Sequence, residues 1–202
     1  MKLHTASRAL ALAVSMLTAS VSAPGVMAGE ALKIDHSHST IGFSVRHLFS
    51  RVNGQFREFE GTIEFNEKAI EASKVTASIK AASVDTNVQG RDEDLRSKRF
   101  FDAASFPTLE FVSTGVKKVD GASFEISGKL TMHGVTKDVV LSAEFLGKGK
   151  DPWGNLKYGF HAETIVNRKD FGMQWNEVVE TGGVLVGEEI TITLDIEAAP
   201  AS

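Results

Sequence analysis

Four histidines in this sequence could take part in metal chemistry. His36 and His38 stand two residues apart in "DHSHS", so on a strand both would point to the same face. With His47 or His133 as a third ligand, such a pair could bind zinc or copper, and an open fourth position would permit zinc-dependent hydrolysis. Histidines at the start of a strand more often hydrogen-bond to a carboxylate or to the backbone. We therefore predict no functional metal site and no cofactor.

The sequence fits neither the pattern of a calcium-binding loop nor that of a catalytic nucleophile. "DTNVQG" places Asp85 and Gly90 at the first and sixth positions of a calcium loop, but Arg96 stands at the twelfth, where a bidentate glutamate belongs. The sequence contains no Gly-x-Ser-x-Gly nucleophile elbow. Asp92 and Asp94 fit a solvated face of a charged helical turn better than acid-base catalysis. The sequence therefore predicts a protein that is not an enzyme.

The stretch "NRKDFGMQW" combines charged and apolar residues. Arg168, Lys169 and Asp170 precede Phe171 and Trp175, so a basic rim could meet an anionic head group while the aromatic residues meet its tail. The same stretch is equally typical of a strand end and turn that packs into the core and leaves its charges exposed. Both interpretations stay open at this point.

The first 28 residues have the pattern of a secretory signal peptide. Lys2 and Arg8 form a positive region, residues 9–17 an apolar region, and Ala28 ends a small-residue cleavage site. We expect cleavage after Ala28, which leaves residues 29–202 as one exported domain. The apolar stretch is short for a membrane span, and no later stretch approaches 18 consecutive apolar residues.

Composition restricts the possible partners. The chain has no cysteine, so disulfides, thiol nucleophiles and cysteine metal sites are excluded. Two of the 22 basic residues and none of the 26 acidic ones lie in the leader, which gives the remaining chain a net charge of 20 minus 26, or −6. That balance disfavours nucleic acid and anionic membrane surfaces as partners.

Alternation of apolar and polar residues is the main structural signal. In "FEISGKLTM", Phe124, Ile126 and Leu130 face one way and Glu125 and Lys129 the other, as in a half-buried strand. Eight such runs occur, which are "TIGFSVRH", "EGTIEF", "SKVTASIKAA", "TLEFVSTGVKKV", "FEISGKLTM", "DVVLSAEFLG", "KYGFHAETIVN" and "ITITLDIE". Short polar connections favour antiparallel neighbours, and closure into a barrel avoids exposed edges. A two-sheet sandwich is the alternative.

Two irregularities interrupt the strand pattern. Phe56 is out of step with Phe59, Ile63 and Phe65, which indicates a bulge or a bend in the second strand near Gly54. Between the third and fourth strands, "RDEDLRSKR" places acidic residues before basic ones, the order that a helix dipole favours, and predicts a short helix at residues 91–99. Four phenylalanines follow within a short distance. They could line one end of a cavity or plug a solid core.

Four ordered motifs carry a resemblance to a known family. They are "IDHSHSTIGFSVRHL", "RDEDLRSKRFFDAASFPTLEF", "GKLTMHGVTKDVVL" and "VNRKDFGMQWN", and with them the sequence resembles the YceI-like family of exported, lipocalin-like proteins over residues 31–196. The matching positions are Asp35, His38, Arg46, His47, Phe106, Pro107, Asp170, Phe171, Gly172 and Trp175. The resemblance implies an all-β, eight-stranded antiparallel barrel, a periplasmic location and often a homodimer. It also implies that the lumen holds a long isoprenoid or fatty chain.

The alternation and the resemblance together predict the residues that would contact such a ligand. The inward candidates along the strands are Phe43, Val45, Ile79, Phe111, Phe124, Ile126, Leu130, Leu141, Phe160, Ile192 and Leu194, with Phe100, Phe101, Phe106, Phe171 and Trp175 at one end. The expected function is binding of a polyisoprenoid or fatty-acid derivative without catalysis. The alternatives are a filled-core structural or protein-interaction module and, less favoured, a metal-dependent hydrolase.

Overall fold

The described part of the chain forms a single antiparallel barrel with one α-helix. The computed structural model describes residues 29–178 and 183–201. Its strands are β1 (Glu30–Ile34), β2 (Thr40–His47), β3 (Ser50–Phe56), β4 (Phe59–Phe65), β5 (Lys74–Lys80), β6 (Val84–Asp85), β7 (Thr108–Asp120), β8 (Ser123–Met132), β9 (Val135–Lys150), β10 (Leu156–Asn167) and β11 (Val186–Pro200). The helix α1 spans Gln89–Arg96. The predicted signal peptide lies outside the described residues.

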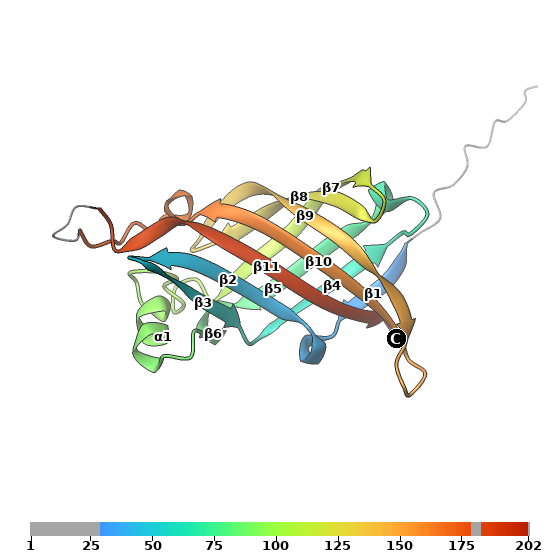
Figure 1. The fold of residues 1–202 in the computed structure, drawn as a ribbon, viewed down its shortest axis with the longest axis horizontal. Coiled ribbons are helices and arrows are strands. Elements are labelled where there is room, and N and C mark those ends of the chain that lie inside the picture. Colours follow the sequence, from blue (N-terminus) through green and yellow to red (C-terminus); the bar gives the residue numbers. More distant parts are fainter. Residues whose placement is uncertain (1–28, 179–182, 202) are drawn as a thin grey trace, which may run out of the picture.

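These segments combine into eight barrel strands because three of the eight are each interrupted once. β1 and β2 follow one another along β11, β3 and β4 form the second strand, and β5 and β6 form the third. Pairing of β1 and β2 with β11 closes the barrel (Figure 1). The predicted closed, eight-stranded antiparallel barrel with one helix is thereby confirmed, and the sandwich alternative is wrong.

The three interruptions lie beside the same row of paired residues. Ile41 of β2 pairs with Phe56 of β3, and Phe56 pairs with Val84 of β6. Beyond this row, the residues between β3 and β4 hydrogen-bond to Ser83, which lies between β5 and β6. The Arg57 amide donates to the Ser83 carbonyl at 3.0 Å, and the Glu58 amide donates to Ser83 Oγ at 3.0 Å. The bend expected in the second strand is therefore present, between β3 and β4.

The sequence prediction missed β1, and it placed the histidines of "DHSHS" incorrectly. β1 is a five-residue strand with only Leu32 and Ile34 buried, too short for a clear alternation. His36 and His38 lie in a 3-10 helix (His36–His38) instead of on a strand face. The Asp35 side chain accepts a hydrogen bond from the Ser37 amide and so starts this turn.

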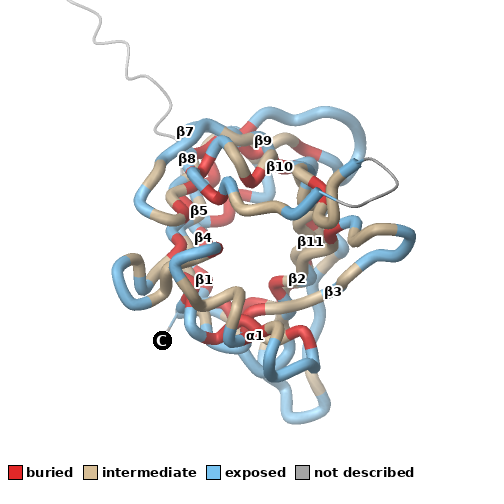
Figure 2. The backbone as a smooth tube through the Cα atoms, turned by 90° about the vertical axis from the view of Figure 1, so that its left-hand side faces the viewer, coloured by how far each residue is buried: buried red, intermediate tan, exposed pale blue. Residues whose placement is uncertain are grey.

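The helix α1 lies at one end of the barrel, beside β3 and β6 (Figure 1). Viewed along the barrel from this end, the strands run around a common axis, and buried residues recur along them (Figure 2). The opposite end carries the β4–β5 loop, the β7–β8 turn and the β9–β10 hairpin, near the last described residue. The two ends differ in how they are closed, and this difference determines where a ligand can enter.

Candidate functional site

The candidate site is the lumen of the barrel. It contains a cavity of about 210 Å³, counted as the space open to the centre of a water molecule. On that scale a single water needs roughly 10–15 Å³, so the lumen is far larger than a packing defect. Its wall is almost entirely hydrocarbon. The filled-core alternative does not describe this barrel.

Glycines opposite two phenylalanines help to keep the lumen open. Phe43 pairs with Gly54 on the neighbouring strand, and a Cβ at Gly54 would lie only 2.4 Å from the Phe43 ring. A Cβ at Gly128 would lie 2.3 Å from the ring of Phe111. Each ring therefore occupies space that a side chain at the glycine would need, directly over the neighbouring backbone.

Thirteen of the predicted ligand residues line this cavity. They are Phe43, Val45, Ile79, Phe100, Phe101, Phe111, Phe124, Ile126, Leu130, Leu141, Phe160, Ile192 and Leu194. Eleven of them lie on strands, and the alternation of a strand sends every second side chain inward. Phe100 and Phe101 come from the turn after α1. That these residues contact a ligand remains a prediction.

Three predicted residues do not line the cavity. Phe106 packs outside the lumen against the His133 ring, with ring centroids 5.0 Å apart, because Pro107 directs the chain into β7 at this point. Phe171 is 1% exposed and lies in the turn after β10, where its carbonyl contacts His133 Nδ1 at 3.0 Å. Trp175 lies behind Phe100, with centroids 5.3 Å apart, and so supports the wall without forming it.

The structure adds lining residues that the sequence prediction passed over. Most of them face the same side of a strand as a predicted ligand residue, as Ile41 does with Phe43 and Leu109 with Phe111. The alternation of apolar residues was therefore sufficient to find them. Ile34 belongs to the unpredicted strand β1. The wall also includes Phe56, Ile63, Phe65, Ile70, Val75, Ala77, Leu95, Val116, Met132, Val139, Ala143, Ala162, Val166, Met173, Val186, Ile190 and Ile196.

Aromatic side chains close the lumen differently at its two ends. At the α1 end, Phe101 packs edge-on against Phe56 with centroids 5.5 Å apart, and Leu95 adds a contact from the helix. At the opposite end, Phe65 contacts the rings of Phe145, Tyr158 and Phe160 at centroid distances between 4.8 and 6.0 Å.

Hydrogen bonds of Asp92 hold α1 in place over its end of the barrel. Asp92 is only 6% exposed, and its Oδ1 accepts from the Thr86 amide at 2.8 Å and from Thr86 Oγ1 at 2.5 Å. Arg96 donates to the carbonyls of Ala82 and Val84 at 2.7 and 2.8 Å. The prediction of a solvated face was therefore wrong for Asp92, because its carboxylate satisfies the buried Thr86.

Arg168 is not part of a basic rim. It continues the inward-facing residues of β10 and is 2% exposed, with its guanidinium donating to the carbonyls of Gly187, Met173 and Trp175 at 2.6–2.9 Å and to that of Val186 at 3.5 Å. Burial lowers its pKa from the ordinary arginine value. Neither interpretation of "NRKDFGMQW" describes Arg168 fully: the segment packs into the core, but the charge of Arg168 is buried with it instead of exposed. The guanidinium ties the segment after β10 to the start of β11.

The histidines considered as metal ligands lie apart in separate hydrogen bonds. His36 Nε2 contacts the Arg57 carbonyl, and His133 Nδ1 contacts that of Phe171. His38 Nδ1 lies 3.0 Å from Asp35 Oδ2, as expected for a histidine beside a carboxylate. His47 ends β2 at the α1 end.

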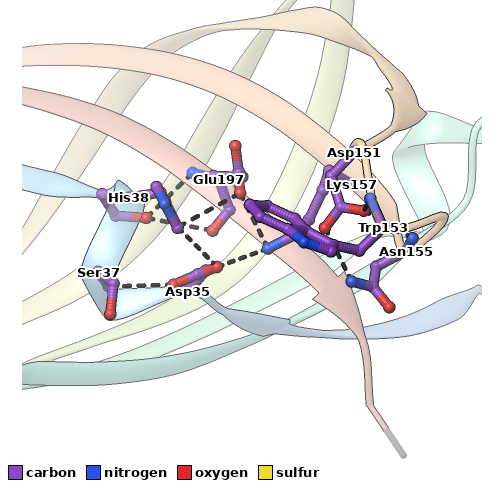
Figure 3. Close-up of polar contacts among 9 residues, drawn as sticks. Asp35, Ser37, His38, Asp151, Trp153, Asn155, Lys157 and Glu197 are labelled. Atoms are coloured by element: carbon purple, nitrogen blue, oxygen red, sulfur yellow. Dashed lines mark hydrogen bonds and ion pairs between the residues drawn. The ribbon is translucent and has the colours of Figure 1, made fainter.

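Asp35, His38 and Glu197 do bring three possible ligand atoms within 4.8 Å of one another. However, the ammonium of Lys157 already lies between the two carboxylates, 2.6 Å from Asp35 Oδ2 and 3.0 Å from Glu197 Oε1 (Figure 3). The cluster joins the turn before β2 to β10 and β11. The lysine supplies the positive charge here, so the arrangement fits a structural ionic cluster better than a metal site.

Lys157 and His38 hold the pKa of Asp35 down to about 2, from its usual 3.8, because both side chains hydrogen-bond to the carboxylate. A depressed pKa stabilises the fold above pH 4, and this contribution is lost as the pH falls toward 2. The Asp35 and Lys157 side chains are each 22% exposed, so solvent screens part of the effect.

Asp35→Asn should therefore lower the free energy of unfolding by about 1–2 kcal/mol at pH 7, and the difference from the wild type should shrink between pH 4 and pH 2. Urea titrations at several pH values measure this. Glu60→Gln serves as the control, since Glu60 is exposed and forms no ion pair in the described part of the chain. A difference that is the same at every pH would contradict the ionic account.

The polar residues in the described wall of the lumen are mostly engaged with protein partners. Ser73 Oγ accepts from the Asn66 amide, His161 contacts Asp195 and Arg168 binds carbonyls. Among the described lining residues, no serine or threonine hydroxyl hydrogen-bonds to a histidine or a carboxylate there. The arrangement can hold a hydrocarbon chain away from water.

Comparison with known proteins agrees with this geometry. The family profile described as "YceI-like domain" matches residues 32–198. A UPF0312 protein of Pectobacterium atrosepticum is 45% identical over 164 residues, which cover 80% of this chain and 83% of the relative. The protein named YceI of Escherichia coli O157:H7 is 43% identical over 154 residues, which cover 73% of this chain and 80% of the relative.

Solved structures share the fold. BcnA of Burkholderia cenocepacia superposes with a TM-score of 0.74 at 21% identity, over 82% of this chain and 99% of that chain. A YceI protein of Campylobacter jejuni has a TM-score of 0.68 at 31% identity, and the match covers 78% of this chain and 90% of that chain. A polyisoprenoid binding domain from Saccharophagus degradans has a TM-score of 0.58 at 13% identity, and the match covers 85% of this chain and 99% of that chain.

Proposed function

The chain belongs to the YceI-like family, and from this premise we propose that it binds one long apolar molecule in the barrel lumen without transforming it. The observation that carries the proposal is the cavity of about 210 Å³ with an almost wholly hydrocarbon wall. An empty apolar space of this size inside a barrel stabilises nothing by itself, whereas burying a hydrocarbon chain in it releases water from apolar surface.

The ligand class we propose is a polyisoprenoid or a fatty-acid derivative. Both are long, narrow and apolar over most of their length, which suits a lumen enclosed by strands along its whole length. The Saccharophagus degradans domain, which has the same fold, is described as polyisoprenoid binding. That description supports the isoprenoid class for this chain, and the hydrocarbon wall is equally compatible with acyl chains.

Export is the second part of the proposal. We propose that residues 1–28 are a signal peptide, that cleavage after Ala28 leaves residues 29–202 as the mature binding domain, and that this domain works in the periplasm. Among the described residues, no helix has the length and apolar character needed to cross a membrane.

Mass spectrometry of the protein from its native source should find Gly29 at the N-terminus. An intact Met1 in a cytoplasmic fraction would contradict the export proposal. Light scattering after gel filtration of the mature chain tests the homodimer that the family resemblance predicts.

A chain-length series tests ligand binding. Each added methylene buried in the lumen should contribute about 0.8 kcal/mol, so affinity should rise about fourfold per carbon until the lumen is full. Calorimetric titration of the delipidated mature protein with alcohols of 8 to about 20 carbons measures the trend. An affinity that does not depend on chain length would show that the chain binds outside the lumen.

A further inference from the structure

A second cavity lies directly beyond the lumen at the end opposite α1. It measures about 110 Å³ on the same scale and is formed by the β4–β5 loop, the β7–β8 turn and Phe145 of β9. Three side chains, Phe65, Ile70 and Phe124, belong to the walls of both cavities. The two cavities therefore adjoin one another at these side chains.

The two cavities differ in chemistry. The lumen wall is hydrocarbon, whereas the second cavity mixes apolar and polar surface and includes Lys68, Lys118, Glu67, Glu71 and Ser123. A ligand with one polar end cannot place that end in the lumen without losing its hydration. The second cavity offers polar surface that adjoins the lumen.

The charges around this cavity favour an anion. Lys68 and Lys118 make no ion pair within the described residues. The Glu67 carboxylate is already bound by Lys148 at 2.5 Å, so Glu71 is the only carboxylate of the described wall without a lysine partner. The cavity wall itself carries two lysines and two glutamates, and because Lys148 pairs with Glu67 from outside the wall, Lys68 and Lys118 are balanced only by Glu71.

The segments that carry the two lysines are held in shape. Asn66 Oδ1 accepts from the amides of Lys68 and Ala69 at 3.2 and 2.9 Å, which fixes the start of the β4–β5 loop. In the β7–β8 turn, Gly121 adopts a positive φ of 50°, and the carbonyl of Ala122 accepts from the Phe145 amide at 3.0 Å. The cavity thus does not depend on a loop that must first be ordered.

We infer that the second cavity is the binding site for the anionic head group, a phosphate or a carboxylate, of the ligand whose chain fills the lumen. The head group lies between Lys68 and Lys118, and the chain passes Phe65, Ile70 and Phe124 toward Phe100 and Phe101 at the α1 end. This inference rests on the proposed function and adds to it the orientation and the charge of the ligand.

Paired ligands of equal chain length test the inference. Delipidated mature protein is titrated with hexadecanoic acid and hexadecanol, and with farnesyl phosphate and farnesol. The wild type should bind each anion about three- to tenfold more tightly than its alcohol, since exposed charge pairs contribute modestly. The larger preference, for acid or for phosphate, identifies the head group.

Lys68→Gln with Lys118→Gln should lower the affinity for each anion to that of its alcohol. The matched control is Lys137→Gln, which removes an exposed lysine at the start of β9, at the opposite end of the barrel, that forms no ion pair with another described residue. Equal binding of anion and alcohol by the wild type would overturn the inference, as would a preference that survives the double substitution. If neither the acid nor the alcohol binds, the proposed function itself fails.

Discussion

Ala162→Phe should lower the affinity for a long-chain alcohol at least tenfold while changing the free energy of unfolding by about 1 kcal/mol or less. Ala162 lies on β10, pairs with Ala143 and Leu194 on the two neighbouring strands, and lines the lumen. A phenyl ring there displaces several methylenes of ligand, each of which contributes about 0.8 kcal/mol. The ring enters existing empty space, so little overpacking follows.

The matched control for this substitution is Glu163→Phe. Glu163 is the next residue along β10 and is exposed on the outer surface of the barrel. Calorimetric titration gives the affinity of both variants, and urea unfolding gives their stability. Unchanged binding by Ala162→Phe would contradict ligand binding in the lumen, and so would an equal loss in the two variants.

Arg168→Met should lower the free energy of unfolding by about 3–5 kcal/mol. The substitution leaves the carbonyls of Met173, Trp175 and Gly187 without the guanidinium donor, and each unsatisfied buried group costs about 1–3 kcal/mol unless water reaches it. The Val186 carbonyl keeps its hydrogen bond from Asn176 Nδ2 at 2.7 Å. The segment after β10 should also detach from β11. Urea unfolding at pH 7 measures the loss.

Lys169→Met is the comparison for Arg168. Lys169 forms an ion pair with Glu188 at 2.5 Å, and both side chains are more than a third exposed, so its loss should cost less than about 1 kcal/mol. Similar costs for the two substitutions would show that the guanidinium does not carry the structural role assigned to it.

Much of the fold follows from the alternation of single residues. In "FEISGKLTM" and "ITITLDIE" the apolar phase is strict, and the structure places their strands and their inward faces as predicted. The turn before β2 was not predictable in the same way. His36 and His38 keep a strand-like spacing, but the hydrogen bond from the Ser37 amide to Asp35 competes with strand pairing and prevails.

The candidate site was harder to predict than the strands because its character depends on contacts between distant segments. Whether Phe43 fills the lumen or lies against its wall depends on Gly54, which only the strand register places beneath the ring. Arg168 looks like a surface residue in "NRKDFG", yet four carbonyls from later segments surround it. Composition does not report empty volume, so the cavity appeared only in the folded structure.

The measurement that tests the central claim most directly is lipid mass spectrometry of an organic extract of the protein purified from its native source. The account predicts recovery of a polyisoprenoid or fatty-acid derivative in an amount comparable to that of the protein, and its depletion in the extract of Ala162→Phe but not of Glu163→Phe. Absence of any such lipid, together with no binding of added prenyl or acyl chains by the delipidated protein, would contradict it.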